Sequence, residues 1–206
     1  MADPIRFYFD FSSPYAWFAL DRLEHLARMH QREIVWRPVL LWAVFKAQGI
    51  PVPLEAPAKR AYLIADMERS AAFYGVPFRL PDVLGVSTHL AARLFYAMTQ
   101  DRPHIAPALA RTLLRAHLAE NRPLTEEAVL LACAAAFGWG PEEARAALQA
   151  AACKQQLVAA VDEAVALGVI GSPFFVVDGE GFFGVDRLPH VAWRLAGSGQ
   201  GGQNDR

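Results

Sequence analysis

The turn Ser12-Ser13-Pro14 has the residue types and the position in this 206-residue chain that could do chemistry. An aromatic, β-favouring run at 5–11 precedes it, and leucines recur at helical spacing after it. Ser13 is typical of an N-cap and Pro14 of the first helical residue. The pattern predicts a helix whose positive dipole end points at the Ser13 hydroxyl, where it could stabilise an anion. A simple capped helix with no chemistry is the alternative.

The flanking elements predict how this turn is held. A second strand is expected at 33–39, and the intervening helix makes it a parallel neighbour of the first strand. From 41 to 152 strand-like runs are absent, and caps and breakers recur at helical intervals. Helices are predicted at 58–73, 89–98, 105–118, 125–137 and 141–150.

The strand signal returns near the C-terminus. A helix at 154–167 precedes strands at 174–177 and 182–183, which the tight turn Asp178-Gly179-Glu180-Gly181 joins into a hairpin. Asp186 is expected to cap a last helix that ends at Leu195. The order β-α-β, helical insert, α-β-β-α predicts an α/β, thioredoxin-like fold with an inserted all-α domain.

The predicted domains follow from this order. A discontinuous thioredoxin-like domain covers 1–40 and 154–196, and the helical insert domain covers 41–153. The polar, glycine-rich segment 197–206 is expected to be a flexible tail.

Composition excludes several classes of function. A formal net charge of −1 provides no basic surface for nucleic acid, and no apolar run reaches membrane-spanning length. With no signal-peptide pattern at the N-terminus, we expect a soluble cytoplasmic protein. Cys133 and Cys153 lie far apart in alanine-rich stretches, so we expect buried core residues rather than a disulfide or a zinc site. The six histidines are scattered, and no metal is predicted.

Four motifs together resemble one family. FDFSSPYAW near the start, GSPFFVV around Pro173 and FFGVDRL at 182–188 resemble glutathione-dependent 2-hydroxychromene-2-carboxylate isomerases and kappa-class glutathione transferases, which have a DsbA-like thioredoxin fold. The spacing within the helical segment is also similar to that family, at Pro57, Lys59, Tyr62, Asp66, Arg69, Gly75 and Pro77. The resemblance extends over essentially the whole chain except the tail.

The resemblance gives the serine turn a specific role. In thioredoxin-like disulfide oxidoreductases this turn holds Cys-x-x-Cys, but here the two positions are Ser13 and Ala16, so disulfide exchange at the turn is excluded. The turn would instead stabilise an external thiolate, supplied by glutathione. Lowering a thiol pKa by about two units needs roughly 2.7 kcal/mol. A helix N-terminus supplies at most about 2 and a charge-assisted hydrogen bond roughly 1.5 to 3 kcal/mol. Ser13 is therefore expected to donate to the glutathione sulfur and not to act as a nucleophile.

The same resemblance implies the other glutathione contacts. Pro173 would follow a cis peptide bond and leave the backbone N–H and C=O of Ser172 free for the cysteinyl part. Asp186 would bind the γ-glutamyl amino group, the backbone N–H of Val185 would help at that end, and Lys59 would pair with the glycyl carboxylate. Each has a bland alternative, such as a strand-opening proline, a helix cap or a solvated lysine.

Some residues depart from the family pattern or fall outside glutathione binding. Val185 stands where the family usually has Asn or Ser, and Gly49-Ile50-Pro51 lacks the Asn that often contacts glutathione, so binding is expected to be weaker or differently posed. We interpret Tyr62, Asp66 and Arg69, three to four residues apart on one helix face, as a structural polar network. We expect the acceptor pocket between the two lobes, lined by apolar residues such as Trp42 and Phe45.

The leading functional hypothesis is a glutathione-dependent isomerase of 2-hydroxychromene-2-carboxylate or a related aromatic substrate. A kappa-like glutathione transferase is a close rival. A thioredoxin-like scaffold protein without catalysis is an alternative from another class, and a thiol oxidoreductase is disfavoured because the turn has no cysteine. The resemblance also implies glutathione as the cofactor, an aromatic small-molecule partner and a homodimer.

Overall fold

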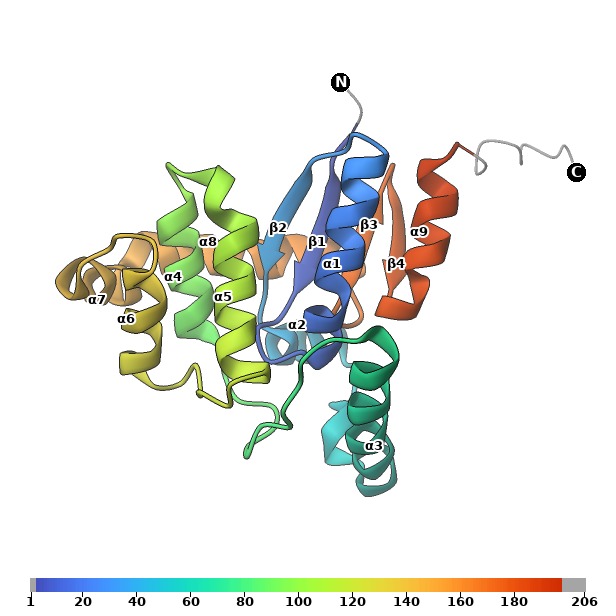
Figure 1. Cartoon of the computed structure of the whole chain (residues 1–206), viewed down its shortest axis with the longest axis horizontal. Coiled ribbons are helices and arrows are strands. Elements are labelled where there is room, and N and C mark those ends of the chain that lie inside the picture. Colours follow the sequence, from blue (N-terminus) through green and yellow to red (C-terminus); the bar gives the residue numbers. More distant parts are fainter. Residues whose placement is uncertain (1–2, 198–206) are drawn as a thin grey trace, which may run out of the picture.

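A four-stranded mixed sheet in the order β2-β1-β3-β4 forms the centre of the computed structural model, which describes residues 3–197 (Figure 1). β1 (Ile5–Phe9) pairs in parallel with β2 (Ile34–Pro38). On its other side β1 pairs antiparallel with β3 (Phe174–Val177), which in turn pairs antiparallel with β4 (Glu180–Phe183). This confirms the thioredoxin-like α/β topology that the sequence predicts.

All residues of β1 except the exposed Arg6 are buried, because both faces of the strand are covered. Ile5, Phe7 and Phe9 belong to the main hydrophobic cluster, whereas Tyr8 belongs to a second cluster on the opposite face. The Phe7 ring stacks on Phe9 and on Phe175 of β3, with centroid distances of 4.6 and 5.4 Å. These aromatic contacts fix the strand whose end leads into the serine turn.

Helices cover the sheet on both faces. α1 (Pro14–Met29) and α9 (Leu188–Leu195) lie over one face, as Figure 1 shows. On the other face, α2 (Leu41–Gln48) and α8 (Ala151–Ala166) contribute buried alanine and valine side chains to the Tyr8 cluster. The sheet is therefore the middle of three layers.

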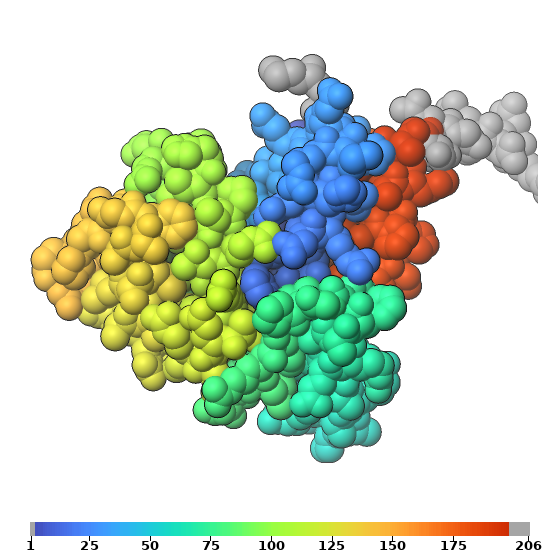
Figure 2. Space-filling view, in the orientation of Figure 1, coloured from blue at the N-terminus to red at the C-terminus, as the bar shows by residue number. Residues whose placement is uncertain are grey.

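The predicted helical segment is confirmed. It also contains α3 (Pro57–Tyr74), α4 (His89–Thr99), α5 (Ala106–Leu118), α6 (Glu127–Ala135) and α7 (Pro141–Gln149). Leucines of α5 and α6 are buried in the same hydrophobic cluster as Phe7 of β1, so one core runs from the sheet into these helices. α3 differs: it buries only Met67 and Ala71 along 18 residues and forms a lobe beside the rest of the molecule (Figure 2).

The predicted boundaries agree with the structure to within three residues, but the capping residue of the last helix was predicted wrongly. Asp186 does not cap it: Asp186 lies inside a short 3-10 turn, Val185–Arg187, and α9 begins at Leu188. Of the predicted tail 197–206, all but Gly197 lies outside the described residues.

Two expectations about cysteines and membranes can be compared with the structure. Cys133 and Cys153 are both buried free thiols, as predicted, and burial raises the pKa of each. Within residues 3–197, no helix has the length and apolar character that crossing a membrane would require.

The aromatic stack on β1 gives a first prediction. Phe7→Ala is expected to lower the free energy of unfolding by about 3–5 kcal/mol, because a fully buried ring is lost from a closely packed cluster. Urea unfolding followed by circular dichroism measures the change. Phe73→Ala is the matched control: its ring is 76% exposed, so we expect a change within about 0.5 kcal/mol. Equal losses in the two variants would contradict this account of the core.

Candidate functional site

Ser13 is the N-cap of α1, as the sequence predicts, and its hydroxyl makes two hydrogen bonds. The oxygen accepts from the backbone N–H of Ala16 at 3.3 Å, and the hydroxyl donates to the backbone carbonyl of Ser172 at 3.0 Å. The residue is 8% exposed. Pro14 occupies the first turn, where its missing N–H leaves no helical bond unmade. The hydroxyl is thus held at the positive end of a 16-residue helix.

The loop before β3 lies directly against this turn. The Ser172–Pro173 bond is cis, as the resemblance implied. The Ser172 hydroxyl accepts from the backbone N–H of Asp10 at 3.0 Å, which ties the loop to the end of β1. The Ser172 carbonyl accepts the Ser13 hydroxyl, but a carbonyl oxygen has two lone pairs, so its pairing with glutathione stays a prediction. The sequence could not show this contact, which joins residues 159 positions apart.

Tyr15 and Trp17 hold α3 beside the start of α1, and sequence reasoning missed both. The Tyr15 hydroxyl donates to Asp66 at 2.7 Å, and the indole N–H of Trp17 donates to the Pro77 carbonyl at 2.8 Å. Burial, with the adjacent Asp66, raises the pKa of Tyr15, so the phenol stays neutral and remains a donor. Both residues lie in the first turn after Ser13, and their large polar-tipped rings were the available signal.

The predicted polar network on α3 is confirmed. Asp66 also accepts from Arg69 at 2.7 Å, and the Arg69 guanidinium lies over the Tyr62 ring at 5.9 Å from its centroid. Lys59 lies in the first turn of the same helix and is exposed. It precedes Asp66 by seven residues, about 10 Å along the axis, so α3 carries its ammonium away from the point where Tyr15 anchors the helix.

Val185 and Asp186 lie in the 3-10 turn that follows β4. Val185 as a whole is buried. The Asp186 side chain is 64% exposed and pairs with Arg187 at 3.2 Å. Burial, then the nearby Asp186 carboxylate, raises the pKa of Tyr74. This carboxylate therefore lies near the C-terminal end of α3, while Lys59 lies at the opposite end of that helix.

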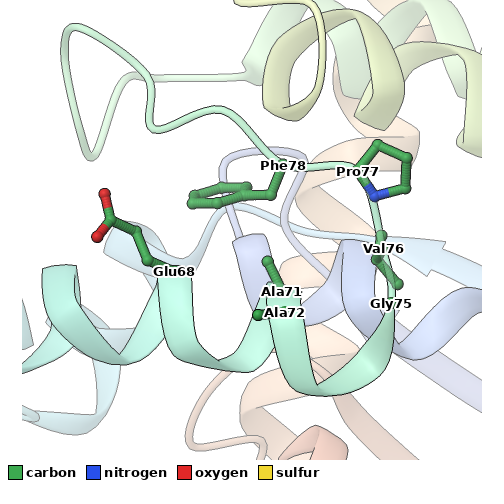
Figure 3. Close-up of a pocket in the computed structure, with 7 residues that line it drawn as sticks. All are labelled: Glu68, Ala71, Ala72, Gly75, Val76, Pro77 and Phe78. Atoms are coloured by element: carbon green, nitrogen blue, oxygen red, sulfur yellow. The ribbon is translucent and has the colours of Figure 1, made fainter.

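A hollow of about 440 Å³ lies between α3 and the segment that follows it (Figure 3). Ala71, Ala72 and Val76 form part of an apolar wall, and the Phe78 ring extends over α3. Glu68 also lines it, and a carboxylate there disfavours an anionic ligand. Neither residue proposed for the acceptor pocket lines this hollow: Phe45 is 7% exposed and Trp42 is 53% exposed, so only Trp42 is available to a substrate.

Comparisons with known proteins identify the family of the chain. Residues 4–196 match the family model described as DSBA-like thioredoxin domain. The chain is 29% identical to glutathione S-transferase kappa 2 of Caenorhabditis elegans over 205 residues, which cover 93% of this chain and 91% of the relative. It is 32% identical to 2-hydroxychromene-2-carboxylate isomerase of Sphingobium xenophagum over 190 residues, which cover 91% of this chain and 95% of that relative.

A solved structure of a 2-hydroxychromene-2-carboxylate isomerase has the same fold. It superposes with a TM-score of 0.83 at 24% identity and covers 95% of this chain and 96% of its own.

Gly184 gives a prediction about the Asp186 turn. It has φ 105° and ψ 150°, a region open essentially to glycine alone, and a Cβ there would collide with an Asp186 carboxylate oxygen. Gly184→Ala is expected to lower the free energy of unfolding by about 1–3 kcal/mol and to displace that carboxylate. Gly140→Ala, where a Cβ meets open space, should lose at most about 1 kcal/mol. Thermal and urea unfolding compare the two, and equal losses would contradict the argument.

Proposed function

Because the chain belongs to the DsbA-like thioredoxin family, together with 2-hydroxychromene-2-carboxylate isomerases and kappa glutathione transferases, we propose that it ionises glutathione at Ser13. The reaction we propose is isomerisation of 2-hydroxychromene-2-carboxylate or a related aromatic substrate. The single observation that supports it most is the Ser13 hydroxyl, held at a helix N-terminus against the Ser172 carbonyl.

Two bonds orient the hydroxyl for this task. Because its oxygen accepts from the Ala16 N–H, the hydroxyl proton points away from the helix, toward Ser172. The cysteinyl N–H of glutathione, laid along this loop like an added strand, would donate to the Ser172 carbonyl in its place. The Ser13 proton is then available to the sulfur. The oxygen of Ser13 keeps its own proton throughout, because it only donates a hydrogen bond.

The energies are of the right size. A thiol of pKa about 8.5 is a few per cent ionised at neutral pH, and two units of lowering need roughly 2.7 kcal/mol. The helix end contributes about 0.3–2 and the hydroxyl roughly 1.5–3 kcal/mol. The turn itself has no thiol, since Cys133 and Cys153 lie buried in α6 and α8. The sulfur therefore comes from the bound tripeptide.

The remaining steps conserve glutathione. The thiol proton leaves to solvent, and the thiolate forms a bond to an unsaturated carbon of the conjugated substrate. The substrate ring opens by breaking its C–O bond: the ring oxygen keeps the electron pair and takes up a proton as a phenol, while the 2-hydroxyl loses its proton and becomes a ketone. Rotation then occurs about the carbon–carbon bond that addition made single. Expulsion of the thiolate restores the double bond in its new geometry, so no electrons enter or leave.

The ends of glutathione would be bound by residues on opposite sides of the turn. We propose Lys59 for the glycyl carboxylate, Asp186 for the γ-glutamyl amino group and the Val185 backbone N–H for the glutamyl carboxylate. The exposed Lys59 and the 64% exposed Asp186 side chain are both open to a ligand. The homodimer implied by the resemblance stays a prediction, which sedimentation equilibrium would check.

A transferase is the second candidate, because the kappa transferase relative covers the chain as fully as the isomerase does. Two assays with the purified chain separate the two. An isomerase converts 2-hydroxychromene-2-carboxylate with catalytic amounts of glutathione and leaves its concentration unchanged. A transferase consumes one glutathione for each chloronitrobenzene converted. Absence of turnover in both assays, with no binding of glutathione, would favour the scaffold alternative.

Ser13→Ala provides the direct test of sulfur activation. We expect the ultraviolet absorbance of the bound thiolate to disappear at neutral pH, because about 1.5–3 kcal/mol of hydrogen bonding to sulfur is lost. A pH titration of that absorbance measures the thiol pKa in each protein. Ser87→Ala, which removes an exposed hydroxyl before α4, should leave the titration unchanged. A normal thiolate signal in Ser13→Ala would refute the assignment.

Lys59→Ala tests which end of glutathione α3 binds. Since an exposed ion pair contributes about 0.2–1 kcal/mol, we expect affinity for glutathione to fall about two- to fivefold. Calorimetry with γ-glutamylcysteine, which has no glycyl residue, should show no such loss. Arg60→Ala changes the neighbouring exposed cation and is the matched control. An equal loss of affinity for glutathione and for γ-glutamylcysteine would mean that Lys59 does not bind the glycyl carboxylate.

A further inference from the structure

Asp10 is a buried acidic residue at the end of β1 to which the proposed chemistry gives no role. It is 3% exposed, and both carboxylate oxygens have partners. Oδ1 accepts from the Ser12 N–H at 2.9 Å, from the Ser12 hydroxyl at 2.8 Å and from the Thr88 hydroxyl at 2.8 Å. Oδ2 accepts from the Leu41 N–H at 2.8 Å. These donors satisfy the hydrogen-bonding capacity of a side chain that is shielded from water.

The partners of Asp10 belong to separate parts of the chain. Leu41 is the first residue of α2 and Thr88 is the N-cap of α4, and neither helix has a side-chain cap of its own. The Asp10 carboxylate therefore serves as the cap for α2, with its negative charge at the positive end of that helix. Ser12 is the neighbour of Ser13. One side chain thus fixes the starts of two helices to the serine turn.

The backbone of Asp10 adds a fourth connection. Its N–H donates to the Ser172 hydroxyl at 3.0 Å, while the Ser172 carbonyl accepts the Ser13 hydroxyl. The two segments that would flank a bound sulfur are therefore joined through one residue. His117, buried near Asp10 in the last turn of α5, is a titratable neighbour; burial lowers its pKa and Asp10 opposes that shift.

We propose that Asp10 is a positioning residue for the sulfur site, an inference that depends on the proposed role of Ser13. By binding Ser12 it sets the backbone of the turn and so the direction of the Ser13 hydroxyl. By binding Thr88 and Leu41 it fixes that direction relative to the helical segment. Asp10 itself touches neither glutathione nor the substrate.

Charge and position predict opposite effects when Asp10 is neutralised. A carboxylate close to a thiolate repels it, so removal of the negative charge alone would lower the thiol pKa of bound glutathione. Loss of positioning would turn the Ser13 hydroxyl away from the sulfur and raise that pKa. Asn keeps the shape of Asp but presents an NH₂ group either to the Leu41 N–H or to the Ser12 N–H, and neither N–H can accept, so at least one connection is lost.

The experiment titrates the thiolate absorbance of glutathione bound to the full chain and to Asp10→Asn. We expect Asp10→Asn to raise the thiol pKa by about one unit, from about 6.5 to about 7.5, which lowers the thiolate fraction at neutral pH about threefold. Affinity for S-methylglutathione, which has no thiol, should change less than about threefold. This pair of readouts separates sulfur ionisation from binding of the rest of the tripeptide.

Three further variants keep the test decisive. Thr88→Val should shift the thiol pKa in the same direction by a smaller amount, and Thr88→Ser, which keeps the hydroxyl, should restore the original value. This pair replaces Asp10→Asn if that variant does not fold. Tyr8→Phe is the structural control. Tyr8 lies in β1, two residues before Asp10, and the substitution removes its 2.6 Å hydrogen bond to Glu163. It should leave the thiol pKa of bound glutathione unchanged.

The outcomes distinguish the two levels of the proposal. An unchanged or lowered thiol pKa in Asp10→Asn or Thr88→Val, while the original chain ionises glutathione, overturns the role of Asp10 alone. A shift of equal size in Tyr8→Phe also overturns it, since general loss of stability would then explain the effect. If the original chain does not ionise glutathione, the proposed function fails, and the inference fails with it.

Discussion

The hydrogen bond from the Ser13 hydroxyl to the Ser172 carbonyl is the contact on which the site depends. It joins two loops 159 residues apart, one at the start of α1 and the other before β3. β1 and β3 are adjacent antiparallel strands, so the end of one lies beside the beginning of the other. The sheet order therefore brings the helix N-terminus and the cis-proline loop to one place, with a hydroxyl between them.

The helical segment is part of the same physical unit as this site. Its leucines share a hydrophobic cluster with Phe7 and Phe9 of β1, and Tyr15 of α1 is bonded to Asp66 of α3. A ligand on the serine turn would thus contact elements fixed by both the sheet and the helices. Replacing the redox cysteines of the turn by Ser13 and Ala16 leaves the helix dipole unchanged, so the same scaffold can serve a sulfur bound from outside.

The order of strands and helices could be predicted from the sequence, because local signals mark each element. Apolar runs predict the strands, and proline and glycine limit the helices. Asp186 was expected to cap α9 because Asp is a typical cap residue, but the residue at the cap position is Arg187. The hydrogen bond between Ser13 and Ser172 was not predicted, because its two residues lie far apart along the chain.

Residue types and spacing alone determined the thioredoxin-like topology, the serine in place of cysteine and the helix that begins there. The tertiary structure alone decided how the hydroxyl is aimed, because this depends on donors and acceptors from distant segments. Asp10 shows the difference most clearly. It was the single acidic residue in an aromatic run, yet its partners at Leu41, Thr88 and Ser172 come from three later segments that only folding brings together.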